Sequence, residues 1–192
     1  MKQIILASTS PRRREILEKT RIKFKVVASD YEEDMNLKLN PKELAKELSC
    51  GKARAVIKKY KNAIIIGADT FVVLNNKLLG KPHTTEEAKK MLRKVSGKTL
   101  SIISGLTVID SSNGKKISKA TETKVYIKKL TTSEIDDYVA SKEPLDKAGA
   151  FAIQDLGSTF IKRIEGDYLN AIGLSLYELA KVLNKFNVNI LG

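Results

Sequence analysis

The start of the chain carries residues of the types that bind anions. Ser8 and Ser10 precede Pro11, whose fixed φ and missing N–H suit the first position of a helix. Ser10 then takes the N-cap position, and Arg12 and Arg13 follow in the first turn. A helix start offers unpaired N–H groups and the positive end of the helix dipole, and two guanidinium groups favour a phosphate or a carboxylate as the anion. The spacing alone slightly favours a plainer alternative, a capped surface helix with solvated arginines.

Asp69 is the carboxylate that the sequence places best for chemistry. It follows Ala63–Ile66, a continuously apolar run that is typical of a strand buried on both faces. We therefore expect Gly67–Thr70 at the carboxyl end of that strand, the edge at which open α/β sheets bind ligands. The alternative is an aspartate that only caps the strand or stabilises a turn.

Two lysines add positive charge. Lys81 lies in a Gly-Lys-Pro turn that directly follows a predicted hairpin over residues 71–79. Lys52 lies within a predicted helix, where an exposed helix lysine is the simpler interpretation. His83, the single histidine, follows the same turn and is expected to be exposed in the loop.

The elements that must position these residues are strands and helices in mixed order. Strands are predicted at residues 4–6, 24–27, 63–66, 71–74, 77–79, 99–110, 117–129, 150–153 and 159–164, and helices from 11, over 40–60 and 84–95, near 132–138 and from about 174. The hairpins are too many for a purely parallel doubly wound sheet, so we expect an α/β fold with a mixed, twisted sheet flanked by helices. The 192 residues, 42% of them hydrophobic, support one core and hence a single domain over 1–192.

Composition excludes several classes of protein. No segment approaches the roughly 20 apolar residues of a membrane span, and the N-terminus lacks the features of a signal peptide. We therefore expect a soluble, cytoplasmic protein with no membrane partner. Cys50 is the only cysteine, which excludes an intrachain disulfide and a cysteine-rich metal site.

The chain is strongly basic. Its 35 Lys and Arg against 22 Asp and Glu give a formal charge of +13, which attracts polyanions such as nucleic acids and nucleotides. Most of the excess is scattered lysine, with no RNA-binding aromatic motif and no Trp, so a nucleic-acid partner is not expected. The exception is residues 11–25, where basic residues concentrate beside the predicted anion site.

Five stretches together resemble the motifs of one family. They are Leu6–Leu17, Asp30–Glu33, Gly67–Thr70 with Leu79–Pro82, Ala148–Gln154, and Ile164–Tyr168 with Gly173–Leu174. In these stretches, which together extend over nearly the whole chain, the sequence resembles the Maf family, the nucleoside triphosphate pyrophosphatases also called septum formation inhibitors. Any one stretch would be a weak match, but five in the family's order are specific.

The resemblance implies a fold, a reaction and a site. The fold would resemble inosine triphosphate pyrophosphatase, with a central nucleotide cleft shared by Arg13, Asp69 and Lys81. Water would attack the α-phosphorus of a nucleoside triphosphate, and pyrophosphate would leave. The residues implied in substrate binding are Ser8, Ser10, Arg12, Arg13, Lys52, Lys81 and Gln154.

The same resemblance implies a metal cofactor held by carboxylates. Mg²⁺, or another divalent cation such as Mn²⁺, takes oxygen ligands, and Glu33 and Asp69 are the implied ligands. Asp69 would also orient or deprotonate the attacking water. Asp30, Glu32 and Asp34 compete with Glu33 for its place in the motif.

Gln154 is the implied reader of the base. Its amide carries a donor and an acceptor, which match the O4/N3 edge of uracil or thymine. The stretch around it resembles the branch of the family that prefers dTTP and UTP rather than the branch that acts on 7-methyl-GTP. Three residues depart from the family pattern: Phe151 replaces tyrosine, Asp155 replaces a glycine and Ser175 replaces a proline. Asp155 would be unfavourable if its turn needs a positive φ.

Other functions remain open from the sequence. The charge and the septum name suggest a regulator of cell division or a nucleic-acid-binding protein, and related activities are the hydrolysis of inosine triphosphate or of 7-methyl-GTP. A homodimer is expected from the habit of the family and the frequency of twofold assemblies.

Overall fold

The structure is a computed structural model that describes residues 2–35 and 37–191. The chain forms two compact units. Unit 1 comprises Met1–Thr70, Ile103–Thr121 and Leu169–Gly192, and unit 2 comprises Phe71–Ile102 and Glu122–Tyr168. The single domain predicted over 1–192 stays a prediction, and its first and last residues lie outside the described part of the chain.

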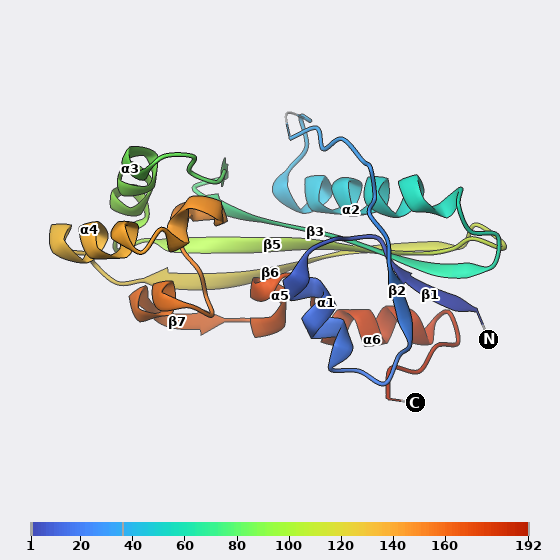
Figure 1. Cartoon of the computed structure of the whole chain (residues 1–192). Helices are drawn as coiled ribbons and strands as arrows, with labels where there is room; N and C mark the ends of the chain where they lie inside the picture. The colour runs from blue at the N-terminus through green and yellow to red at the C-terminus, as the bar shows by residue number, and fades with distance from the viewer. Residues whose placement is uncertain (1, 36, 192) are drawn as a thin grey trace. The chain divides into compact units, whose positions relative to one another are not determined.

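Strands and helices follow one another as a mixed α/β fold, as predicted (Figure 1). The strands are β1 (Gln3–Leu6), β2 (Phe24–Val26), β3 (Ala63–Leu74), β4 (Lys77–Leu79), β5 (Thr99–Asp110), β6 (Lys116–Ile127) and β7 (Ile161–Glu165). The helices are α1 (Pro11–Glu18), α2 (Pro41–Ile57), α3 (Thr85–Val95), α4 (Thr132–Ala140), α5 (Tyr168–Ile172) and α6 (Leu176–Asn184), and the 3₁₀ turns are η1 (Glu143–Asp146), η2 (Ala148–Ala150) and η3 (Leu156–Phe160).

The sheet is mixed, which confirms the prediction of its class. Its strand order is β2-β1-β3-β5-β6-β7, with β4 beside β3. β1 runs parallel to both β2 and β3, whereas β4 is antiparallel to β3 and β7 is antiparallel to β6. The predicted hairpin is present, and Asn75 and Asn76 supply its turn with φ of 50° and 61°.

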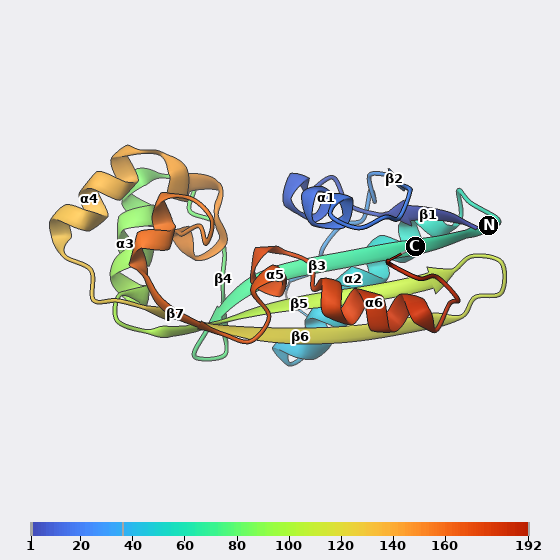
Figure 2. The same ribbon diagram turned by 90° about the horizontal axis from the view of Figure 1, so that it is seen from below.

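In unit 1 the sheet is covered by helices on both faces, with α2 on one face and α1 and α6 on the other (Figure 1). The alternation of side chains along a strand divides the core accordingly. Ile5 and Ile65 pack with α2 residues such as Ala53, and neighbouring positions on the same strands pack with α1 and α6. In Figure 2, which is seen from below, α6 lies in front of the strands and α2 lies behind them.

β3 is longer than predicted, and this corrects the expected place of Asp69. The strand continues from Ala63 to Leu74, so Asp69 lies inside it and not at its carboxyl end. Residues 71–74 are apolar and buried, and their side chains favour continued extension. The parallel partner β1 ends at Leu6, opposite Ile66. Asp69 therefore still lies beyond the carboxyl end of the neighbouring strand β1.

Unit 2 contains β4, α3, α4, β7 and the three 3₁₀ turns. The strand predicted at residues 150–153 is wrong, because Gly149 and Ala150 adopt φ of 76° and 61°, which an extended strand cannot contain. The strand predicted at 159–164 is present only from Ile161, after η3. Among the described residues, none of the helices combines the length and the apolar character that crossing a bilayer requires.

The start of α4 gives a pH-dependent prediction. Thr131 and Glu134 form a capping box, and Lys128 also donates to the Glu134 carboxylate at 2.5 Å. The bonds from Lys128 and Thr131 lower the pKa of Glu134 from 4.5 to about 2. Since the folded-state pKa is depressed, this stabilisation is present above about pH 4.5 and is lost as the pH falls towards 2. The Tm deficit of Glu134→Gln relative to the wild type should therefore shrink between pH 5 and pH 2, and a constant deficit would contradict it.

Candidate functional site

The loop between β1 and α1 leads the backbone from the sheet into the first turn of a helix. Ser10 occupies the N-cap position of α1 and Pro11 its first turn, as predicted. The Ser10 side chain makes no capping bond in the described structure; instead its backbone N–H donates to Ser8 Oγ at 3.3 Å. Arg12 is half-buried on the same turn. The start of α1 therefore retains its attraction for an anion.

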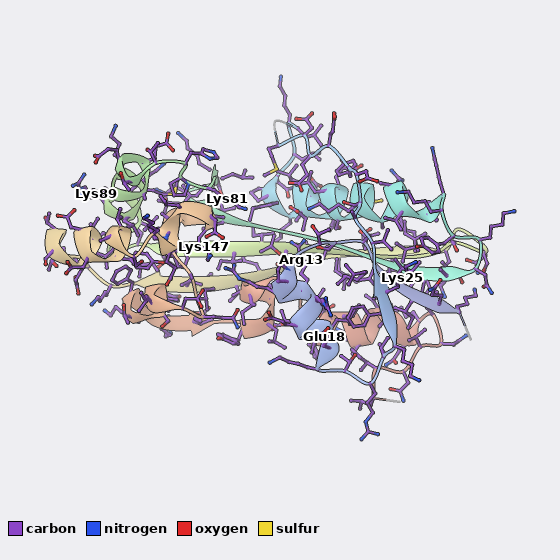
Figure 3. All side chains as sticks on the ribbon, viewed as in Figure 1. Arg13, Glu18, Lys25, Lys81, Lys89 and Lys147 are labelled. Atoms are coloured by element: carbon purple, nitrogen blue, oxygen red, sulfur yellow. The ribbon has the colours of Figure 1, made fainter. Side chains whose placement is uncertain are left out.

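Arg13, which Figure 3 labels, is the buried cation of this turn. Its Nη1 donates to Ser8 Oγ at 3.1 Å, its Nη2 to Thr70 Oγ1 at 3.3 Å and its Nε to the Gly173 carbonyl at 3.1 Å. Burial lowers the pKa of Arg13, whereas the charges of Asp69 and Glu33 oppose that shift. An arginine nevertheless stays protonated. These neutral acceptors fix the guanidinium without neutralising it, so its charge remains available to an anion.

Thr70 and Gly173 are the supports of Arg13 that the sequence analysis did not identify. Thr70 Oγ1 lies 2.8 Å from Ser104 Oγ and donates to the same Gly173 carbonyl. Gly173 has φ of 147°, which glycine adopts far more readily than other residues. Both residues lay within the family motifs, but their spacing alone carried no sign that they hold the arginine.

Lys52 joins the two predicted carboxylates. Its Nζ lies 2.5 Å from Asp69 Oδ1 and 2.7 Å from Glu33 Oε1. Lys52 and Asp69 are both more than nine-tenths buried, and Glu33 is partly exposed. The exposed helix lysine that was the simpler interpretation is thus wrong, because α2 directs this side chain to the sheet.

The close approach of α2 to β3 explains how Lys52 reaches Asp69. A Cβ on Gly67 would lie 2.2 Å from the backbone oxygen of Ser49, so only glycine allows this separation. Gly67 and Asp69 are two positions apart on a strand and therefore share the face that α2 covers. Asp69 consequently meets Lys52 on that face, while Thr70 points to the opposite face and meets Arg13.

Tyr31 packs the acidic segment at residues 30–34 against α2. A Cβ on Gly51 would lie 2.2 Å from the Tyr31 ring, so the ring packs directly on the helix backbone. Partial burial, followed by the charges of Glu47 and Glu33, raises the pKa of Tyr31. Asp30 contacts Lys59 at 3.0 Å instead. Glu33, the residue placed in the motif, contacts Lys52.

The carboxylate pair fits the donor chemistry of a hard divalent cation. Lys52 uses one oxygen of Asp69 and one of Glu33, and each carboxylate has a second oxygen. Within residues 2–35 and 37–191, no cluster of three or more His, Cys, Asp or Glu side chains has the arrangement of a metal site. Mg²⁺ in nucleotide enzymes needs only one or two carboxylates, together with substrate phosphates and water. The two carboxylates therefore match such an ion in the type and number of their side chains.

Unit 2 contains the other predicted site residues. Lys81 and Gln154 are both exposed, and Figure 3 labels Lys81 in the loop after β4. The Gly149 N–H donates to the Gly80 carbonyl at 3.0 Å, which joins the loop of Lys81 to the segment that leads to Gln154. His83 is exposed, as expected. That Lys81 shares one cleft with Arg13 and Asp69 of unit 1 stays a prediction.

Two departures from the family pattern have local explanations. Asp155 has φ of −102°, so its position needs no glycine and the expected strain is absent. Ser175 is the N-cap of α6, and its Oγ accepts from the Glu178 N–H at 3.0 Å. A capping serine thus starts this helix where the family usually has a proline.

Comparison with known proteins gives extensive matches. The family model "Maf: Maf-like protein" matches residues 3–186. A dTTP/UTP pyrophosphatase of Methanosarcina barkeri is 48% identical over 99% of this chain and 97% of its own, and one of Alkaliphilus oremlandii is 47% identical over 100% of both. Among solved structures, the Staphylococcus aureus Ham1 protein is 15% identical with a TM-score of 0.47 and covers 66% of this chain and 72% of its own. On the family match and the full-length relatives, the chain belongs to the Maf family.

Proposed function

We propose that this protein hydrolyses dTTP and UTP to the nucleoside monophosphate and pyrophosphate. The observation that carries the proposal is the buried Lys52, whose Nζ contacts both Asp69 and Glu33, in the same unit as the buried Arg13. Fixed cations and carboxylates of this kind suit phosphoryl transfer, in which a protein contributes mainly positioning and charge stabilisation. Full-length relatives bearing the name dTTP/UTP pyrophosphatase support the choice of substrate.

In the proposed reaction each residue of unit 1 has a separate role. Asp69 orients or deprotonates the water that attacks the α-phosphorus, and Lys52 holds the Asp69 carboxylate in place. Arg13 binds the triphosphate with Arg12, Ser8 and the start of α1. One charge pair at about 4 Å is worth about 4 kcal/mol at an effective dielectric of about 20, so a single fixed arginine can change the rate by orders of magnitude.

Glu33 and Asp69 are the proposed ligands of Mg²⁺ or Mn²⁺. When bound, the metal neutralises charge on the phosphates and helps to activate water. In unit 2, Lys81 is proposed to bind the triphosphate and Gln154 to read the pyrimidine. Three further expectations stay predictions: a homodimer, a cytoplasmic location and no nucleic-acid partner. Sedimentation tests the homodimer, and the salt dependence of binding tests for a nucleic-acid partner.

A substrate panel tests the function. Pyrophosphate release should be fastest with dTTP and UTP, should depend on added Mg²⁺ and should disappear on chelation with EDTA. Inosine triphosphate and 7-methyl-GTP serve as the competing substrates. A clear preference for either one would refute the role of Gln154, and no pyrophosphate release from any triphosphate would leave the proposal of a regulator of cell division standing.

A further inference from the structure

The loop that presents Gln154 is held at both ends by two side chains of unit 2. Gln154 is exposed, while Phe151 and Ala152 before it and Gly157 after it are buried. The segment lies between η2 and η3 and belongs to no strand. Its conformation therefore depends on specific contacts rather than on a ladder of backbone hydrogen bonds.

Tyr138 of α4 holds the first end of the loop. The Ala152 N–H donates to Tyr138 Oη at 3.2 Å, two residues before Gln154. The same hydroxyl donates to Glu143 Oε1 at 2.7 Å. One hydroxyl thus links the helix α4, the loop and the carboxylate of η1.

Glu143 holds the second end. Its Oε2 accepts from the Leu156 N–H at 3.0 Å, and its Oε1 accepts from the Gly157 N–H at 3.0 Å. These amides lie two and three residues after Gln154. The pair Tyr138 and Glu143 therefore binds backbone groups on both sides of the predicted base reader, without contacting its side chain in the described bonds.

The pair is itself firmly placed. Tyr138 is 5% exposed, and its ring meets the Phe160 ring edge to face at a centroid distance of 4.9 Å. Burial, reinforced by Glu143, raises the pKa of Tyr138. The hydroxyl therefore stays protonated at neutral pH and donates a hydrogen bond to the carboxylate. A Cβ on Gly157 would lie 2.6 Å from Tyr138 Oη, so the glycine lets the loop approach the hydroxyl this closely.

We propose that Tyr138 and Glu143 are positioning residues for base selection, because they fix the loop that carries Gln154. The inference rests on the proposed function and extends it. An unrestrained glutamine amide can turn over and pair with either uracil or cytosine, since it offers both a donor and an acceptor. Selecting uracil therefore requires the loop to hold Gln154 at a fixed place and in a fixed orientation.

The test compares UTP with CTP, which differ only at the edge that Gln154 would read. The ratio of kcat/KM for UTP to that for CTP should be high in the wild type. Tyr138→Phe should lower this ratio about tenfold, the order expected when one fixed hydrogen-bonding group is displaced. Glu143→Gln should lower it similarly, because an amide has one oxygen where the carboxylate uses two. Gln154→Ala should lower it as well, and adding Tyr138→Phe to that variant should lower it no further.

Tyr126→Phe is the matched control. Tyr126 also lies in unit 2 and also donates to a carboxylate, that of Glu165, at 2.8 Å. Its removal should leave the ratio unchanged. If Tyr126→Phe lowers the ratio as much as Tyr138→Phe, the effect is a general loss of stability and the inference is wrong.

The remaining outcomes separate this inference from the proposed function. If Gln154→Ala lowers the ratio and Tyr138→Phe does not, the inference fails while the function stands. If the wild type hydrolyses neither UTP nor dTTP, or if Gln154→Ala leaves the ratio unchanged, the underlying role of Gln154 fails and the inference fails with it. Should Tyr138→Phe not fold, amide exchange in the wild type decides. Ala152, Leu156 and Gly157 should exchange slowly, and exchange at the rate of an unprotected amide would overturn the inference.

Discussion

The Asp69→Asn variant should release pyrophosphate from dTTP about a thousandfold more slowly than the wild type at saturating substrate, which is the scale of losing a positioned general base. An asparagine keeps the size of the side chain but cannot accept a proton from water. It also removes one of the two carboxylates that Lys52 contacts and one proposed metal ligand. The measurement is steady-state pyrophosphate release with saturating Mg²⁺, so that weaker metal binding alone cannot produce the loss.

Asp110→Asn is the matched control for that variant. Asp110 is 5% exposed, as Asp69 is, lies in the same unit and is paired with a lysine, Lys2. Burial alone would raise the pKa of Asp110, but hydrogen bonds from Lys2 and Ser112 hold it below its ordinary value. Its replacement should therefore lower stability without changing kcat. If both variants lose activity equally, or if Asp69→Asn keeps its kcat, Asp69 does not act on the attacking water.

Patterns that depend on neighbouring residues predicted much of the fold. Pro11 after Ser10 marked the start of α1, and the helix predicted from residue 40 and the hairpin predicted over residues 71–79 are both present. These signals are local, because a cap or a turn is determined by the conformation of a few consecutive residues. The mixed class of the sheet followed from the number of hairpins.

Contacts between distant segments could not be predicted in the same way. Without the family resemblance, Lys52 would be interpreted as a solvated helix residue, because its burial depends on Gly67, 15 positions later, letting α2 approach β3. The role of Gly173 depends on Arg13, which is 160 positions away. The segment at 150–153 was apolar enough to suggest a strand, but the positive φ of Gly149 and Ala150 turns the backbone instead. In each case a tertiary contact or a backbone turn determined the structure, which composition alone did not specify.

The Arg13→Lys variant should lower kcat/KM for dTTP about a hundredfold, although it keeps the charge, which is the scale expected when one oriented donor to a phosphate is lost. The guanidinium reaches Ser8, Thr70 and Gly173 through three different nitrogens. A lysine ammonium is a single point on a flexible stem and cannot make all three bonds while also facing a phosphate. The loss should appear in both KM and kcat, because Arg13 is proposed to bind the triphosphate before and during the transfer.

Arg14→Lys separates the placement of the charge from the charge itself. Arg14 is the next residue on α1, but it is exposed and pairs with Glu18 at 2.7 Å, one turn along the helix. Exposed pairs of this kind contribute little, so Arg14→Lys should match the wild type in kcat/KM and in Tm. If Arg13→Lys stays folded and its kcat/KM is within about threefold of the wild type, a positive charge at this position is sufficient. The three hydrogen bonds of the guanidinium would then have no part in catalysis. A hundredfold loss confined to Arg13 would instead mean that the buried, oriented guanidinium is what the triphosphate requires.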